Sequence, residues 1–159
     1  MAGSATPATR ALDAAGVAYR LHAFTHDPQA ERFGEEAVEA LGADPARVGK
    51  TLVVIDEGGE RRSAVVGVDG RLDLKALAAA AGVKRVGMAD VADAERVTGY
   101  VHGGISPFGQ RRRLATVVDA DLAAHDRVIV NGGRRGLQVE LTPADLVALT
   151  GATVAPIRR

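Results

Sequence analysis

The chain has 159 residues, 47% hydrophobic and 25% charged, and its twenty basic residues balance twenty acidic ones. These values are ordinary for a globular protein, and the length favours a single domain over residues 1–159. The neutral net charge predicts neither nucleic-acid nor membrane binding by itself, and the absence of cysteine excludes disulfides, thiolate metal sites and a cysteine nucleophile.

Helices and strands are interspersed along the chain. The first helix has signals at both ends, with Thr6 as N-cap, Pro7 at the first helical position and Gly16 after the last. The further expected elements, in order, are strand 19–24, helix 33–41, strand 50–56, strand 62–68, helix 74–81, strand 85–88, helix 91–97, strand 114–118, strand 127–131, strand 137–141, helix 143–150 and strand 152–157. Hairpins join 50–56 to 62–68 and 127–131 to 137–141, which predicts an α+β fold and not a strict βαβ repeat.

A glycine-dense stretch spans residues 99–110. Four glycines and one proline in twelve positions exclude a regular helix or a central strand. The stretch also carries Tyr100, Ile105 and Phe108, so it is not a polar linker. Two interpretations remain open here: a tightly packed connection, or a loop that brings bare backbone N–H groups against a ligand.

The sequence gives little support for a serine nucleophile, a metal site or a P-loop. Ser106 is not in a Gly-x-Ser-x-Gly elbow, although His102 is near enough in sequence to be considered as its base. His22 and His26 lie four residues apart along an expected strand, where they would be separated by ~13 Å, so we expect no metal site. Gly49, followed by Lys50 and a threonine, enters a strand and not a helix, which excludes a P-loop.

Two kinds of basic residue could still bind an anion. A lysine that begins an apolar strand, Lys50, can reach into a cleft as a compact cation; the alternative is a solvated lysine at a strand end. Arginine clusters beside glycine-rich loops suit phosphate or RNA backbone, with solvated charge as the alternative. The clusters are Arg111, Arg112 and Arg113, and Arg134 and Arg135.

The beginning of the chain lacks the basic and apolar regions of a signal peptide. No apolar run approaches the ~20 residues of a membrane span. We therefore expect a cytoplasmic protein with no membrane partner.

Several motifs occur together, in order, between Thr6 and Ile157. They are His26–Pro28, Phe33–Glu36, Lys50–Leu52, Leu72–Lys75, Gly99–Tyr100, Gly103–Pro107 and Gly133–Leu137. In this combination the chain resembles the YbaK/EbsC family of freestanding aminoacyl-tRNA editing proteins, which is related to the insertion domain of bacterial prolyl-tRNA synthetases. The resemblance implies a central mixed, barrel-like β-sheet flanked by helices. It also implies an enzyme that removes a wrong amino acid from tRNA, typically cysteine from tRNA(Pro), without a cofactor.

The resemblance also assigns roles to residues. The family's lysine falls on Lys50, its glycine loop on Gly103 and Gly104, and its pocket aromatics near Phe24 and Phe33. The expected substrate-binding set is completed by Thr51, Ser106, Asn131 and Gln138. Asn131 stands where serine is frequent in the family and Gln138 where aspartate can occur, and both can still form hydrogen bonds.

The implied mechanism uses the substrate's own thiol, which attacks the ester and forms a cyclic thiolactone. We expect N–H groups around Gly103, Gly104 and Ile105 to hold the developing oxyanion, and Lys50 to bind the terminal phosphate or polarise the ester. The arginine clusters would contact the tRNA, and prolyl-tRNA synthetase is a candidate partner. Two alternatives stay open: hydrolysis of Ala-tRNA(Pro) by an activated water, and a non-catalytic module that binds tRNA or a synthetase.

Overall fold

The computed structural model describes residues 5–159 and confirms the predicted α+β class. Its elements in chain order are α1 (Pro7–Ala14), β1 (Arg20–Ala23), α2 (Phe33–Leu41), the 3-10 helix η1 (Pro45–Arg47), β2 (Gly49–Asp56), β3 (Arg61–Gly67), α3 (Leu74–Ala81), β4 (Val86–Met88), α4 (Val91–Thr98), β5 (Ala115–Asp119), α5 (Ala120–Ala123), β6 (Val128–Arg134), β7 (Leu137–Leu141), α6 (Pro143–Thr150) and β8 (Thr153–Ala155).

The strands form two sheets. A three-stranded sheet has the order β1-β7-β6, and a five-stranded sheet has the order β4-β2-β3-β5-β8. Strand β5 pairs parallel with β3 and β8, whereas the other pairs within the sheets are antiparallel, so the predicted mixed character is confirmed. A single parallel bridge between Val48 and Ile129 links the sheets. Within residues 5–159 the expected barrel-like sheet is therefore a pair of joined sheets and not a closed barrel.

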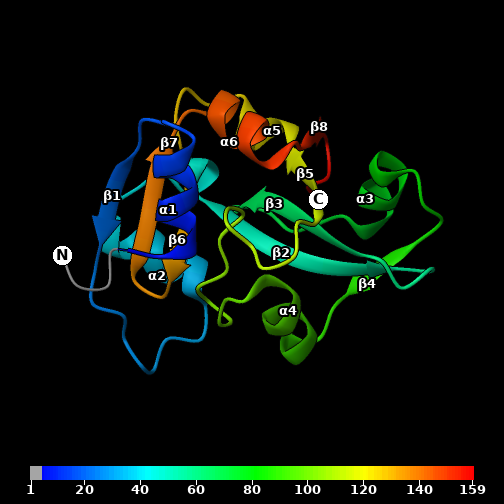
Figure 1. Ribbon diagram of the computed structural model, residues 1–159, viewed down its shortest axis with the longest axis horizontal. Coiled ribbons are helices and arrows are strands. Elements are labelled where there is room, and N and C mark those ends of the chain that lie inside the picture. Colours follow the sequence, from blue (N-terminus) through cyan, green and yellow to red (C-terminus); the bar gives the residue numbers. More distant parts are fainter. Residues whose placement is uncertain (1–4) are drawn as a thin grey trace.

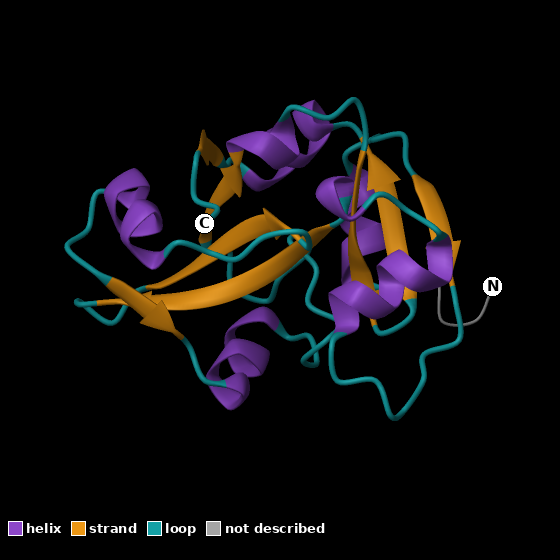
Figure 2. Cartoon of the chain, turned by 180° about the vertical axis from the view of Figure 1, so that it is seen from behind, coloured by secondary structure: helices purple, strands orange, loops and turns teal. Residues whose placement is uncertain are grey.

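The helices cover both sheets. In Figure 1, α1 lies against the three-stranded sheet, while α5 and α6 lie on one side of the β2–β3 hairpin and α4 on the other. Figure 2, from behind, shows this long hairpin reaching from the three-stranded sheet out to β4. None of the helices within residues 5–159 has the length and apolar character needed to cross a membrane.

Alternation along β2 separates two hydrophobic clusters. Val53 belongs to the larger cluster, which joins α1, α4, α6 and the three-stranded sheet. Its neighbour Val54 belongs to the smaller one, with Ala64, Leu77 and Ile157. Successive side chains point to opposite faces of a strand, so β2 packs helices on both of its sides.

The sequence signals place most element boundaries well. Thr6 caps α1 in a reciprocal arrangement with Thr9, and Asp73 caps α3. The main difference lies in the second hairpin, where we expected a turn across residues 132–136. Strand β6 instead continues to Arg134, with a bulge after Asn131, and Gly133 adopts a positive φ of 107° there.

Candidate active site

The two sheets enclose a pocket where they separate. Beyond the Val48–Ile129 bridge, β2 and β6 belong to different sheets, and a cavity of 640 Å³ opens beside them. Strand β4 pairs only with residues 54–56 of β2. Residues 49–53 of β2 line the cavity. The remaining walls come from the start of α2, Val68 and Arg71, residues 88–94, the loop 102–105, and Asn131 and Gln138.

Lys50 lies half-buried in this pocket, which favours the cleft interpretation over that of a solvated lysine at a strand end. Its Nζ donates a hydrogen bond to the carbonyl oxygen of Gly70 at 3.0 Å. Burial lowers the pKa of the Lys50 ammonium, and the nearby Arg71 guanidinium lowers it further. The carboxylates of Glu35 and Asp69 act in the opposite direction. The side chain is therefore a cation whose proton is easier to remove than that of a solvated lysine.

The glycine loop packs against two neighbours. Gly103 has a positive φ of 85°, and a Cβ built on it would lie 2.7 Å from the ring of Phe33. A Cβ on Gly104 would lie 2.9 Å from the backbone of Arg134. The two interpretations of this loop are thus compatible, because close packing is what requires the glycines and the same loop borders the pocket.

The N–H groups of the loop differ in availability. The Gly104 N–H donates to the carbonyl of Val101 at 2.8 Å, so it is already engaged and cannot hold an oxyanion. Within residues 5–159 the N–H groups of Gly103 and Ile105 have no such partner, and both residues line the pocket. The oxyanion hypothesis therefore keeps Gly103 and Ile105 and loses Gly104.

Asn131 braces the loop against the second hairpin. Its Nδ2 donates to the carbonyls of Gly103 at 3.2 Å and Arg134 at 3.1 Å, and its Oδ1 accepts from the Gly133 N–H at 2.6 Å. Both Nδ2 protons are thus used within the protein, which gives Asn131 a positioning role. Because Asn131 also lines the pocket and its Oδ1 can accept a second hydrogen bond, the expected substrate contact stays a prediction. Gln138, opposite Asn131 in register, lines the pocket and is only 6% exposed.

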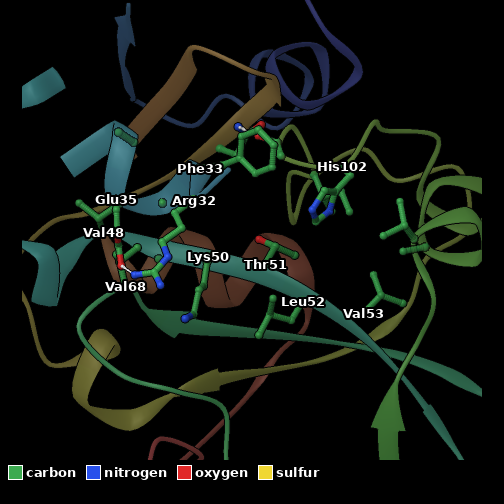
Figure 3. A pocket seen from close by; sticks show the side chains of 18 of the residues that line it. Arg32, Phe33, Glu35, Val48, Lys50, Thr51, Leu52, Val53, Val68 and His102 are labelled. Atoms are coloured by element: carbon green, nitrogen blue, oxygen red, sulfur yellow. Dashed lines mark hydrogen bonds and ion pairs between the residues drawn. The ribbon is translucent and has the colours of Figure 1, made fainter. Parts of the chain in front are cut away.

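Phe33 is the aromatic centre of the pocket mouth. The imidazole of His102 lies edge-on to its ring at a centroid distance of 5.2 Å, and His26 lies tilted at 5.7 Å. The guanidinium carbon of Arg135 stands 5.0 Å above the ring centre, within the range of a cation–π contact. Figure 3 shows Phe33 and His102 facing the cavity from different elements.

Thr51 contributes a hydroxyl to the same pocket. Its Oγ1 is buried and has no hydrogen-bond partner within residues 5–159. In Figure 3 the Thr51 side chain stands beside that of Lys50, on the side of the pocket where Phe33 and His102 lie. A buried hydroxyl without a partner costs about 1–3 kcal/mol, so a ligand that supplied one would recover that energy.

Several predicted residues lie outside the pocket lining. The Ser106 side chain is fully buried and its Oγ accepts from the Phe108 N–H at 3.2 Å, which removes it from the expected substrate contacts. Phe24 does not line the cavity; its N–H donates a hydrogen bond to the Gly136 carbonyl at 2.9 Å. Arg111 and Arg112 are exposed and also lie outside the lining, whereas Arg134 and Arg135 border the glycine loop.

The two histidines that we considered as metal ligands form hydrogen bonds with carboxylates instead. His22 Nε2 lies 2.7 Å from Glu140 Oε1, and His26 Nδ1 lies 2.7 Å from Glu36 Oε1. Sequence reasoning gave His102 only a weak case as a base, yet it lines the pocket. The only indication in the sequence was that His102 is adjacent to Gly103. Nothing in the sequence indicated the contact between Lys50 and Gly70, because twenty residues separate the partners.

A pocket with an ammonium, free backbone N–H groups and an arginine-backed aromatic ring is suited to an ester or a phosphate-bearing ligand. Residues 27–149 match the family model described as "Aminoacyl-tRNA editing domain". The chain belongs to this family of aminoacyl-tRNA editing enzymes, which confirms the resemblance drawn from the sequence motifs.

Individual relatives agree with this assignment. The chain is 37% identical over 123 residues to the "Putative Cys-tRNA(Pro)/Cys-tRNA(Cys) deacylase EbsC" of Enterococcus faecalis, covering 77% of this chain and 75% of that protein. It is 30% identical over 112 residues to the uncharacterized protein YwhH of Bacillus subtilis, covering 70% and 71% respectively. A crystal structure described as a "putative trans-editing enzyme for prolyl tRNA synthetase" matches with a TM-score of 0.86 at 29% identity, covering 100% of this chain and 99% of that one.

Proposed function

We propose that the protein clears cysteine from mischarged tRNA(Pro), with residues 1–159 acting as one editing domain. The observation that carries the proposal is that, in the part of the chain that the structure describes, no serine or cysteine lines the pocket. The sequence has no cysteine, and the Ser106 hydroxyl is buried away from the cavity. A nucleophile supplied by the substrate itself fits such a pocket. The Cys-tRNA substrates named for the Enterococcus relative support the same choice.

In the proposed reaction, the substrate thiol sulfur bonds to the ester carbonyl carbon and the bond from that carbon to the ribose oxygen breaks. The thiol proton ends on the ribose oxygen, so the products are a cysteine thiolactone and tRNA with a free 3′ end. The N–H groups of Gly103 and Ile105 would stabilise the oxyanion of the intermediate. Lys50 would neutralise developing charge on the leaving oxygen or bind the terminal phosphate.

A deacylation assay with matched esters tests this mechanism. Cys-tRNA(Pro) should be cleaved and Ser-tRNA(Pro) should remain largely intact, because the two differ by one atom and a hydroxyl is a far weaker internal nucleophile. S-methylcysteinyl-tRNA(Pro) keeps the sulfur but has no thiol proton to transfer, so it should also survive. Equal cleavage of all three esters would refute the use of the substrate thiol.

One observation favours a second candidate, hydrolysis of Ala-tRNA(Pro) by water. His102 lines the pocket and could act as the base for that water. Rapid cleavage of Ala-tRNA(Pro) that is lost in His102→Gln would establish this candidate. Binding of charged tRNA without cleavage of any ester would instead indicate a non-catalytic module. Adding prolyl-tRNA synthetase to the same assay tests whether that enzyme is a partner.

A further inference from the structure

Within residues 5–159 the ammonium of Lys50 donates its hydrogen bond to one carbonyl oxygen, that of Gly70. In Figure 3 its nitrogen is directed away from Phe33 and His102. The hydrogen bond to the Gly70 oxygen, at 3.0 Å, is the one that fixes this direction. Whatever determines where the Gly70 carbonyl lies therefore determines where the Lys50 cation lies.

Arg158 lies directly against this glycine. A Cβ built on Gly70 would be only 2.3 Å from the Cδ of Arg158 and 2.5 Å from its Cγ, so the arginine stem packs on the bare glycine. The Arg158 guanidinium bonds to the neighbouring Asp69 at 2.7 Å and reaches Asp121 of α5 at 2.9 Å. The turn is thus clamped to α5 through one side chain.

The backbone on either side of Arg158 is also paired with the residues that follow the turn. The N–H of Arg159 donates to the Arg71 carbonyl at 2.8 Å, and the Asp73 N–H donates to the Ile157 carbonyl at 2.7 Å. Ile157 itself is fully buried in the smaller hydrophobic cluster. The segment 157–159 is therefore a fixed support, and Arg158 transmits that support to the turn at Gly70.

We propose that Arg158 is a positioning residue for the Lys50 ammonium, acting through Asp69 and the carbonyl of Gly70. The inference rests on the proposed function for what Lys50 does to the substrate. The charged groups that act on Lys50 are Arg71, Glu35 and Asp69. Removing the Arg158 guanidinium releases the turn and leaves the Asp69 carboxylate without that partner.

Arg158→Met is the main test, because methionine keeps much of the packing against Gly70 and removes the charge. We expect kcat for Cys-tRNA(Pro) to fall about tenfold with little change in KM, since an exposed tRNA contact would mainly affect KM. Arg159→Met is the matched control, because Arg159 pairs through its backbone, and it should keep the wild-type kcat. In a Lys50→Met background, Arg158→Met should cause no further loss, because residues that act through one another are not additive.

A second measurement does not depend on activity. The chain has three lysines, Lys50, Lys75 and Lys84, so their 13Cε signals can be resolved in a protein labelled with 13C-lysine. Burial is the main cause that lowers the pKa of Lys50. In Arg158→Met the Lys50 side chain becomes more exposed to solvent, and Asp69 no longer has the Arg158 guanidinium as a partner. Both changes favour the charged ammonium, so the pKa of Lys50 should rise toward those of the other two lysines.

These readouts separate the possible failures. If the wild-type protein cleaves no ester, the proposed function fails, and the lysine titration still decides whether Arg158 positions Lys50. If Arg158→Met does not fold, Arg158→Gln removes the same positive charge while keeping a polar side chain, leaves the Asp69 carboxylate in place, and should give the same upward shift of the Lys50 titration. A folded variant with unchanged Lys50 titration and unchanged kcat would overturn the inference.

Discussion

Gly103→Ala should destabilise the protein for two separable reasons. The alanine would have to adopt the positive φ of 85°, which costs an L-residue about 1–2 kcal/mol. Its Cβ would also meet three ring atoms of Phe33 at 2.7 Å, which adds an overpacking cost of about 1–3 kcal/mol. We therefore expect the free energy of unfolding to fall by about 2–5 kcal/mol, measured as a lower urea midpoint with an unchanged m-value.

Gly16→Ala isolates the backbone part of that cost. Gly16 has a φ of 69° and no atom within 4 Å of the position of a Cβ, so only the strain of the positive φ applies, about 1–2 kcal/mol. The ring part is isolated by Phe33→Ala, which removes the clash and should make Gly103→Ala less costly in the double variant by at least about 1 kcal/mol. If Gly103→Ala costs no more than Gly16→Ala, or if the Phe33 and Gly103 changes are additive, the packing argument is wrong.

Three further predictions concern ionisable groups. Lys50→Met should lower the deacylation rate about a hundredfold while the thermal midpoint stays close to that of the wild type. Lys75→Met on α3 is the control. A wild-type rate in Lys50→Met would show that Lys50 has no part in the reaction. Burial raises the pKa of Tyr100 to about 12. The folded state therefore holds this proton more tightly than the unfolded chain, so stability should decline as the pH rises from about 10 to 12, and Tyr100→Phe should flatten that decline. The bond from His22 holds the pKa of Glu140 below its ordinary value, so its stabilisation is present above the unfolded pKa and should be lost as the pH falls through the folded one; Glu140→Gln should weaken this acid dependence, and an unchanged acid limb would contradict it.

The sequence predicts the elements of this fold better than their assembly. Caps and terminal glycines set helix boundaries locally, which is why α3 and α6 begin and end where expected; α2 has no side-chain N-cap and is defined locally only at its end, by Gly42. The extension of β6 to Arg134 was missed because consecutive glycines favour a turn. Here Asn131 instead bonds to the Gly133 N–H and the Arg134 carbonyl and holds a bulge. That choice depends on the position of one amide side chain, which composition does not encode.

The site shows the same division. The family motifs place Lys50, Thr51 and Phe33 in one pocket, because Lys50 and Thr51 lie on β2 and Phe33 begins α2; Gly103 lines the same pocket from the loop after α4. They failed for Ser106, whose neighbour Ile105 lines the cavity while its own side chain is fully buried outside the lining. Along an irregular loop no period relates sequence position to direction, so adjacent residues can face opposite sides.

The pocket walls share one mode of support, in which a side-chain donor holds a backbone carbonyl. Lys50 bonds to the Gly70 oxygen, Asn131 to that of Gly103, and the Arg135 Nε to that of His102 at 2.8 Å. The peptide unit that joins His102 to Gly103 is planar and trans, so its carbonyl and its N–H point in opposite directions.

By holding the His102 carbonyl, Arg135 therefore also fixes the direction of the Gly103 N–H, one of the two donors left for the oxyanion. The same guanidinium lies over Phe33, which in turn occupies the space that a side chain at Gly103 would need. An arginine predicted from sequence as a contact for RNA phosphate thus has a defined structural task at the pocket. That task would persist for any ester substrate, because it concerns the orientation of a backbone donor and not the identity of the amino acid.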